Sequence, residues 1–202
     1  GINNAAFGGA TDAGGAALQD NTTGSYNTAF GYSALRTNTT AGDNTAFGAS
    51  ALSSNTTGAF NTALGRQALE LNTSSSNNTA VGYYALRANT GGGNTALGFN
   101  AGDTITSGSS NTCVGAFSDT TGTTSTDANA FGYNVQGETG YTTVGTNAND
   151  IRAANGTATW ATVSDERVKK DIADSTVGLN FINDLQPRTF NYKNKGDIPE
   201  EF

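Results

Sequence analysis

The chain has 202 residues, a net charge of −7 at pH 7, 27 glycines and only 13% charged residues. This acidic balance argues against nucleic-acid binding, which requires basic patches. The lack of histidine removes the usual catalytic base and most metal sites, and the single cysteine, Cys113, excludes an internal disulfide and a cysteine-based zinc site. No apolar run approaches the roughly 18 residues of a membrane span. We therefore expect no membrane insertion and no cofactor.

A repeat of about 17 residues organises the chain over residues 1–134. NTAFGYSALRTNTTAGD (27–43) is followed by NTAFGASALSSNTTGAF (44–60), NTALGRQALELNTSSSN (61–77) and NTAVGYYALRANTGGG (78–93), and an earlier copy, NAAFGG, occupies residues 4–9. The composition alone would also suit disorder, but a fixed period indicates stacked units. The glycines that mark the period are Gly31, Gly48, Gly65, Gly82, Gly98, Gly115 and Gly132.

Each unit is too short for two helices and a turn. It has room for one or two strands of four or five residues, joined by turns rich in Asn, Gly, Asp and Ser. Stacking would bury a continuous column of Ala, Phe, Leu and Val, with neighbouring coils about 4.8 Å apart. The sequence therefore predicts an all-β parallel β-roll or β-solenoid. The asparagines that open the units should form a ladder, each amide bonding the next: Asn27, Asn44, Asn61, Asn78, Asn94 and Asn111.

Because Ala and Gly dominate this core, a single roll would be marginally stable, and assembly of several chains would enlarge the buried surface. The N-T-A-F/L/V-G motif of residues 4–134 resembles the heads of trimeric autotransporter adhesins, whose coils carry an N-S-V-A-I-G-like motif. The resemblance implies a left-handed parallel β-roll in an intertwined or side-by-side homotrimer.

The register loosens over residues 135–163, which we predict to be a β neck that ends the roll. YTTVGT (141–146) and TATWATV (157–163) alternate as strands do. Trp160, the one tryptophan, is expected to pack in a core or an interface.

Charge and composition change at residues 164–172, SDERVKKDI; no lysine precedes this segment. Ser175 suits a helix N-cap and Pro187 a helix stop, and RTFNY then alternates like a strand. This pattern resembles the start of the intramolecular chaperone domain of phage tail spikes, tail fibres and endosialidases, which opens S-D-x-R-x-K-x-x-I and continues to L-x-P-x-x-F-x-Y/W. The matching residues are Ser164, Asp165, Arg167, Lys169, Ile172, Leu185, Pro187, Phe190 and Tyr192.

The resemblance implies that residues 164–202 are the first part of an α+β domain that gathers three chains and is then cut off between Val163 and Ser164. In that family the serine hydroxyl attacks the preceding carbonyl, and Lys169 would be the base that activates it. The alternative from the residues alone is that Ser164 caps a helix whose basic side chains form a solvated face.

These observations predict a structural and adhesive subunit of a phage tail fibre or tail spike, located in the virion and extracellular after release. Its partners would be two further copies of itself, other tail proteins, and a host receptor that is a glycan or an outer-membrane component. Three alternatives are a secreted bacterial trimeric adhesin, an ice-binding solenoid with a threonine row, and a polysaccharide-degrading tail spike. The last requires paired carboxylates, whereas these are scattered over Asp12, Asp20, Asp43, Glu70, Asp103, Asp119, Asp127 and Glu138.

Overall fold

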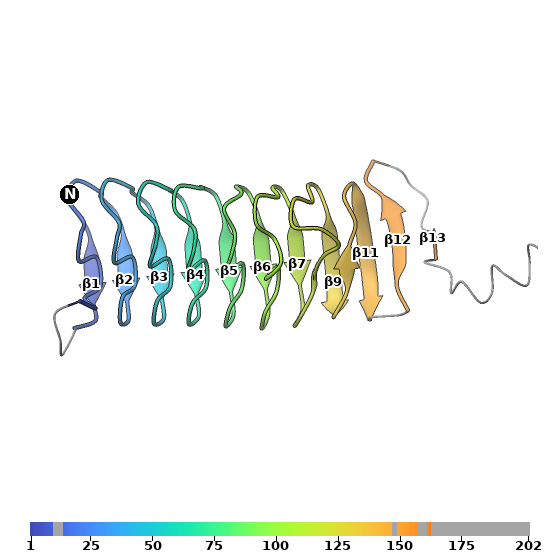
Figure 1. Cartoon of the computed structure of the whole chain (residues 1–202), viewed down its shortest axis with the longest axis horizontal. Coiled ribbons are helices and arrows are strands. Elements are labelled where there is room, and N and C mark those ends of the chain that lie inside the picture. The colour runs from blue at the N-terminus through green and yellow to red at the C-terminus, as the bar shows by residue number, and fades with distance from the viewer. Residues whose placement is uncertain (10–13, 147–148, 157–160, 163–202) are drawn as a thin grey trace, which may run out of the picture. The chain divides into compact units, whose positions relative to one another are not determined.

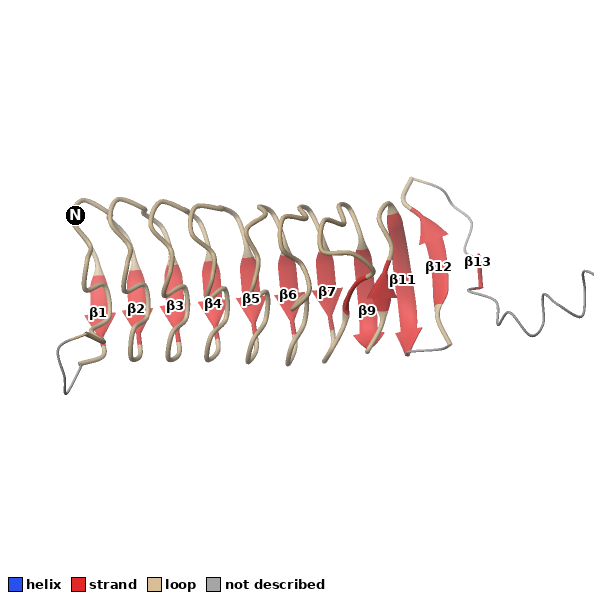
Figure 2. Cartoon of the chain, in the orientation of Figure 1, coloured by secondary structure: helices blue, strands red, loops and turns tan. Residues whose placement is uncertain are grey.

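The structure is a computed structural model that describes residues 1–9, 14–146, 149–156 and 161–162. The chain divides into two units, Gly1–Val163 and Ser164–Phe202, and only the first contains described residues. The described residues form strands and turns without a helix (Figures 1 and 2). Accordingly, no helix long and apolar enough to cross a bilayer occurs in them.

One strand from each coil pairs in parallel with the strands of the coils before and after it. Seven of these strands have three residues each: β1 (Ala5–Phe7), β2 (Thr28–Phe30), β3 (Thr45–Phe47), β4 (Thr62–Leu64), β5 (Thr79–Val81), β6 (Thr95–Leu97) and β7 (Thr112–Val114). Equivalent residues of the repeat lie opposite one another, as Thr45 does Thr62 and Ala46 does Ala63. The predicted all-β parallel solenoid with coils of about 17 residues is thus confirmed, although its strands are shorter than expected.

The repeated glycine ends each strand because no other residue fits there. Gly65 has φ 141°, and a Cβ on it would lie 2.3 Å from the carbonyl oxygen of Gly82 in the next coil. Both the positive φ and the close contact with a neighbouring backbone therefore require glycine. The same crowding recurs between every pair of successive glycines from Gly31 to Gly132, which explains the period seen in the sequence.

The core is a column of small and branched residues: Ala29, Ala46, Ala63, Ala80, Ala96, Cys113 and Ala130 from the strands, with Leu35, Leu52, Leu69, Leu86 and Ile105 from the turns. The prediction that phenylalanine joins this column is wrong for the single chain, since Phe30 and Phe47 are 41% and 48% exposed. The reason is the alternation of a strand: with the central alanine pointing inward, its neighbours point outward.

The four core leucines adopt the left-handed backbone conformation, with φ between 49° and 52°. This conformation costs a bulky residue about 1–2 kcal/mol, and complete burial of the side chain offsets it. In the next coil Gly102 takes the same turn position with φ 64°, and Ile105, three residues later, fills the core instead.

Two rows of buried asparagines connect the coils. In the first, the predicted ladder, the side-chain oxygen of Asn44 accepts the backbone N–H of Asn61 at 2.9 Å, and the amide group of Asn61 donates to the carbonyl of Ser75. The ladder is therefore present, but its repeated bond joins a side chain to a backbone group, and amide-to-amide bonds occur only at some steps. A second row, Asn21, Asn38, Asn55 and Asn72, bonds amide to amide at 2.9–3.2 Å.

The parallel pairing of strands continues to β11 (Tyr141–Thr146) and is followed by antiparallel pairing. β9 (Asn129–Tyr133) and β11 continue the parallel sheet, whereas β12 (Ile151–Ala154) and β13 (Ala161–Thr162) pair antiparallel. A small second sheet pairs β8 (Asp119–Thr120) with β10 (Gln136–Gly137). The predicted strand in YTTVGT is confirmed as β11, and β13 lies within TATWATV, but β12 was not foreseen. Trp160 lies outside the described residues.

Candidate assembly and recognition surfaces

The outer face of the parallel sheet carries a continuous row of large apolar side chains, here called the apolar stripe. Each coil contributes the residue that precedes the repeated glycine, and several of these residues are 41–69% exposed. Exposed apolar patches of this extent mark interaction surfaces. The stripe consists of Phe7, Phe30, Phe47, Leu64, Val81, Leu97, Val114, Phe131 and Val144.

Contacts along the stripe are close enough to make it one surface. The rings of Phe7, Phe30 and Phe47 stack with centroid distances of 4.8 and 4.6 Å. On the same sheet face lies the predicted threonine row, exposed at Thr28, Thr45, Thr62, Thr79 and Thr95. Because threonine alternates with a large apolar residue, this face suits a packed interface better than it suits contact with water.

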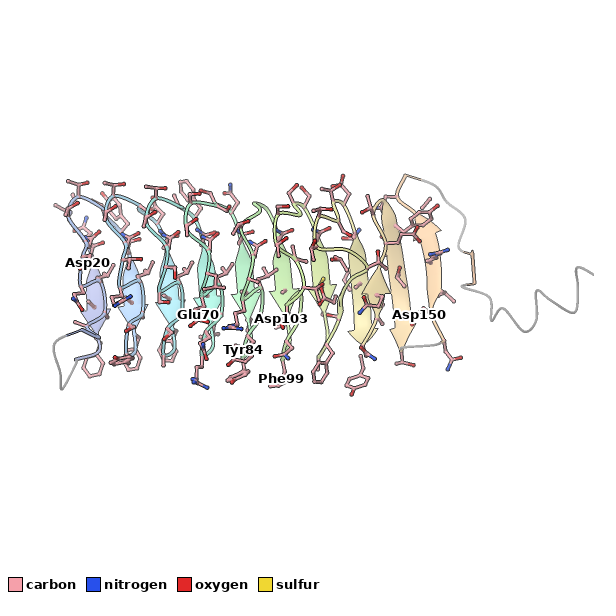
Figure 3. All side chains as sticks on the ribbon, in the orientation of Figure 1. Asp20, Glu70, Tyr84, Phe99, Asp103 and Asp150 are labelled. Carbon is pink, nitrogen blue, oxygen red and sulfur yellow. The ribbon has the colours of Figure 1, made fainter. Side chains whose placement is uncertain are left out.

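A second group of aromatic residues, the aromatic row, lies just after the repeated glycines: the half-buried Tyr83 and Tyr84, and the exposed Phe99, Phe117 and Tyr133, the last of which ends β9. Tyr83 stacks on Phe99 with 5.4 Å between centroids and an interplanar angle of 7°. Phe117 stands edge-on to Phe99 and Tyr133, at 5.2 and 6.0 Å. Tyr84 and Phe99 project beyond the ends of the strands (Figure 3).

Charged side chains flank one end of the aromatic row. The guanidinium of Arg66 lies 5.5 Å from the centroid of the Tyr83 ring and donates a hydrogen bond to its hydroxyl at 3.2 Å. Arg87 lies 4.9 Å from the Tyr84 ring centroid and pairs with Glu70 at 2.8 Å. The hydrogen bond that Tyr84 shares with Tyr83 raises the pKa of Tyr84, and the hydrogen bond to Glu70 raises the pKa of Arg87.

No hydrogen bond joins two carboxylates among the described residues, although Asp103 lies near enough to Asp119 for its charge to help burial raise the pKa of Asp119. Asp119, almost fully buried, accepts hydrogen bonds from the backbone and hydroxyl of Thr104 and from the backbone of Thr120. Burial raises the pKa of Asp119 and of Asp103. These contacts tie two neighbouring coils together, which is a structural role. Burial likewise raises the pKa of the Cys113 thiol, to about 12, so this cysteine is poorly reactive.

The predicted cleavage and chaperone residues lie outside the described residues: Val163, Ser164, Asp165, Arg167, Lys169, Ile172, Pro187 and Phe190. The two exposed surfaces, by contrast, were missed by the sequence reasoning. Strict inward–outward alternation applied to N-T-A-F-G would have placed the phenylalanine outside once alanine was assigned to the core.

Comparison with known proteins gives one match. Residues 164–201 match the family described as chaperone of endosialidase. No curated protein and no solved structure matches the chain.

Proposed function

We propose that this chain is a structural and adhesive subunit of a phage tail fibre or tail spike, in which a homotrimer of rolls forms a stiff shaft. The observation that carries the proposal is the order of the two parts: a β-solenoid followed directly by a segment of the chaperone-of-endosialidase family. Such a chaperone implies trimer formation, and a parallel solenoid with hydrogen bonds along its axis suits a rigid spacer.

The apolar stripe is the surface on which the three chains meet. Left exposed, it would present Phe47, Leu64 and Leu97 to water at 45–49% exposure in a chain whose own core is mostly alanine. Burying each such side chain contributes about 1–2 kcal/mol. Because every coil contributes one, the gain grows with the length of the roll, and a long shaft assembles more firmly than a short one.

The segment from Ser164 onward promotes this assembly and then releases itself. The Ser164 hydroxyl passes its proton to neutral Lys169 and attacks the Val163 carbonyl carbon; the peptide C–N bond breaks as the nitrogen takes up the proton, leaving an ester. Water hydrolyses the ester to a Val163 carboxylate and restores the serine hydroxyl. The family match that begins at residue 164 supports this assignment.

Intact and native mass spectrometry of the full-length gene product tests the proposal, with Ser164→Ala as the inactive variant and Ser175→Ala as the control. We expect trimers whose chains end at Val163 in the wild type and in the control, and uncut trimers in Ser164→Ala. Uncut trimers in all three would remove Ser164 and Lys169 from catalysis while keeping the fibre. Monomers in all three would overturn the trimeric shaft.

The repeat motif also favours a secreted bacterial trimeric adhesin. The location of the protein distinguishes this alternative from a phage tail subunit. We expect peptides from residues 1–163 in purified phage particles from an infected culture, at a constant ratio to the tail proteins. Recovery of the same peptides with the outer membrane of uninfected cells would favour the adhesin instead.

A further inference from the structure

We propose that the aromatic row binds an oligosaccharide that carries carboxylate groups, with Arg66 as the residue that selects the charge. The inference rests on the proposed function and names the surface and the chemical class of the receptor. The row is formed by Tyr83, Tyr84, Phe99, Phe117 and Tyr133.

The fold does not require aromatic residues at these positions. In other coils the same two turn positions hold Ala49 and Ser50, or Arg66 and Gln67, and those coils stack in the same register. Tyr84 and Phe117 moreover have φ 60° and 58°, a conformation that a bulky residue adopts at a cost and that Asn100 meets more easily. The turn imposes this φ, between 52° and 60°, at the same position in every coil from Ser33 to Asn134. A bulky residue such as Phe117, which is exposed there and packs no core, therefore indicates a role other than stability.

The spacing of the rings suits a linear sugar chain. From Tyr83 to Tyr133 one ring follows another along the axis at 5.2–6.0 Å, comparable to the length of one pyranose unit. Phe99, Phe117 and Tyr133 are 40–58% exposed, so the row stays accessible. Aromatic rings carry negative charge on their faces and so attract the polarised C–H groups of a sugar ring.

The charges nearby favour an acidic sugar. Before residue 150 the chain has three basic residues, Arg36, Arg66 and Arg87, and two of these flank the aromatic row. Glu70 neutralises Arg87, whereas Arg66 is exposed and forms no salt bridge with any described residue. A guanidinium held against a ring in this way can receive a carboxylate through two parallel hydrogen bonds.

The distribution of the aromatic row argues against a contact between subunits. The apolar stripe has a member in every coil, as a symmetric shaft requires, whereas the aromatic row is continuous only from Tyr83 to Tyr133. A local cluster on an otherwise regular shaft suits a ligand of a few sugar units.

The test uses the trimer obtained from the full-length gene and a surface that presents hexasaccharides of alginate, cellulose and chitin. We expect the alginate hexasaccharide to bind at least about fivefold more tightly than the neutral ones. The double variant Phe99→Ala, Phe117→Ala should lose at least about tenfold in affinity, and Arg66→Gln should lose only the preference for alginate. The control Phe60→Ala removes an even more exposed ring outside the row and should bind as the wild type does.

Three results would overturn the inference: no binding to any of the three sugars, binding that survives the double variant, or dissociation of the double variant to monomers, which would make the row a subunit interface. Native mass measured on the same samples separates this failure from failure of the proposed function, since intact trimers without sugar binding would leave the shaft in place.

Discussion

The apolar stripe and the aromatic row are both exposed and both rich in phenylalanine, yet they differ in distribution. The stripe repeats in every coil and follows from the same motif that builds the core. The aromatic row is not a fixed part of the motif: exposed Tyr32 holds an equivalent position, but successive rings contact one another only from Tyr83 to Tyr133. The difference suggests a rule for solenoids of this kind: residues that repeat serve stacking and assembly, and residues that break the repeat serve a local purpose.

The largest effect is expected from a change to the repeated glycine, which tests whether the residues that recur in every coil are needed for stacking. Gly65→Ala places a methyl group 2.3 Å from the Gly82 carbonyl oxygen at φ 141°. We expect destabilisation of at least about 4 kcal/mol, because a backbone neighbour cannot move aside as a side chain can. Reaction of Cys113, buried at the core, with a thiol reagent measures the loss of packing.

Gly122→Ala is the control, since its added methyl would meet only the Ser125 hydroxyl at 3.4 Å. Equal thiol protection in the two variants would show that coil contact does not impose the repeated glycine.

A matched pair of phenylalanines then separates assembly from recognition. Phe47 on the stripe and Phe99 in the aromatic row are 48% and 45% exposed in the single chain. Phe47→Asp would place a charge in the proposed subunit interface and should weaken the trimer by at least about a hundredfold in the dissociation constant. Phe99→Asp should leave the trimer intact. Analytical ultracentrifugation of both variants decides the matter, and the reverse outcome would exchange the roles of the two surfaces.

The period of the glycines was enough to predict the coil length, the parallel stacking and the asparagine ladder, because each depends on contacts between equivalent residues. What could not be predicted is the direction of single side chains. Phe30 was assigned to the core, since an apolar residue is expected inside until the three-residue strand is seen to face alanine inward. The aromatic row escaped notice for another reason: Phe117 contacts Phe99 and Tyr133, which occupy a different position of the repeat in their own coils.

A smaller loss of stability is expected from a change in the asparagine ladder, whose residues also recur in every coil. Asn61→Ala removes the acceptor of the Asn78 backbone N–H, at 3.0 Å, and the donor to the Ser75 carbonyl. The Ser75 carbonyl keeps its bond from the Asn72 amide, but the backbone N–H and the side-chain amide of buried Asn78 both lose their acceptor. This should cost about 2–4 kcal/mol in unfolding free energy. Ser74→Ala, at an exposed turn residue of the same coil, is the control. Denaturant unfolding that gives equal midpoints for the two variants would show that the ladder is energetically neutral.

The smallest effect concerns Asp119, a buried carboxylate that also breaks the repeat. Burial raises its pKa in the folded state above the ordinary value of 3.8. As pH falls from neutrality through the raised pKa toward that value, the folded state binds the proton first, so its stability rises. We therefore expect the chain to resist urea more as the pH is lowered from neutrality toward 3.8.

Asp119→Asn should flatten this dependence, whereas Asp43→Asn, at an exposed residue, should keep it. Asp103, whose pKa is also raised by burial, would leave a residual slope in the first variant. If stability instead fell with acidification in the wild type, the hydrogen bonds from Thr104 and Thr120 would outweigh burial, because they favour the charged carboxylate. In that case Asp119 would stabilise the stack of coils, although it departs from the repeat. A residue that breaks the motif would then not by itself indicate a loss of stability.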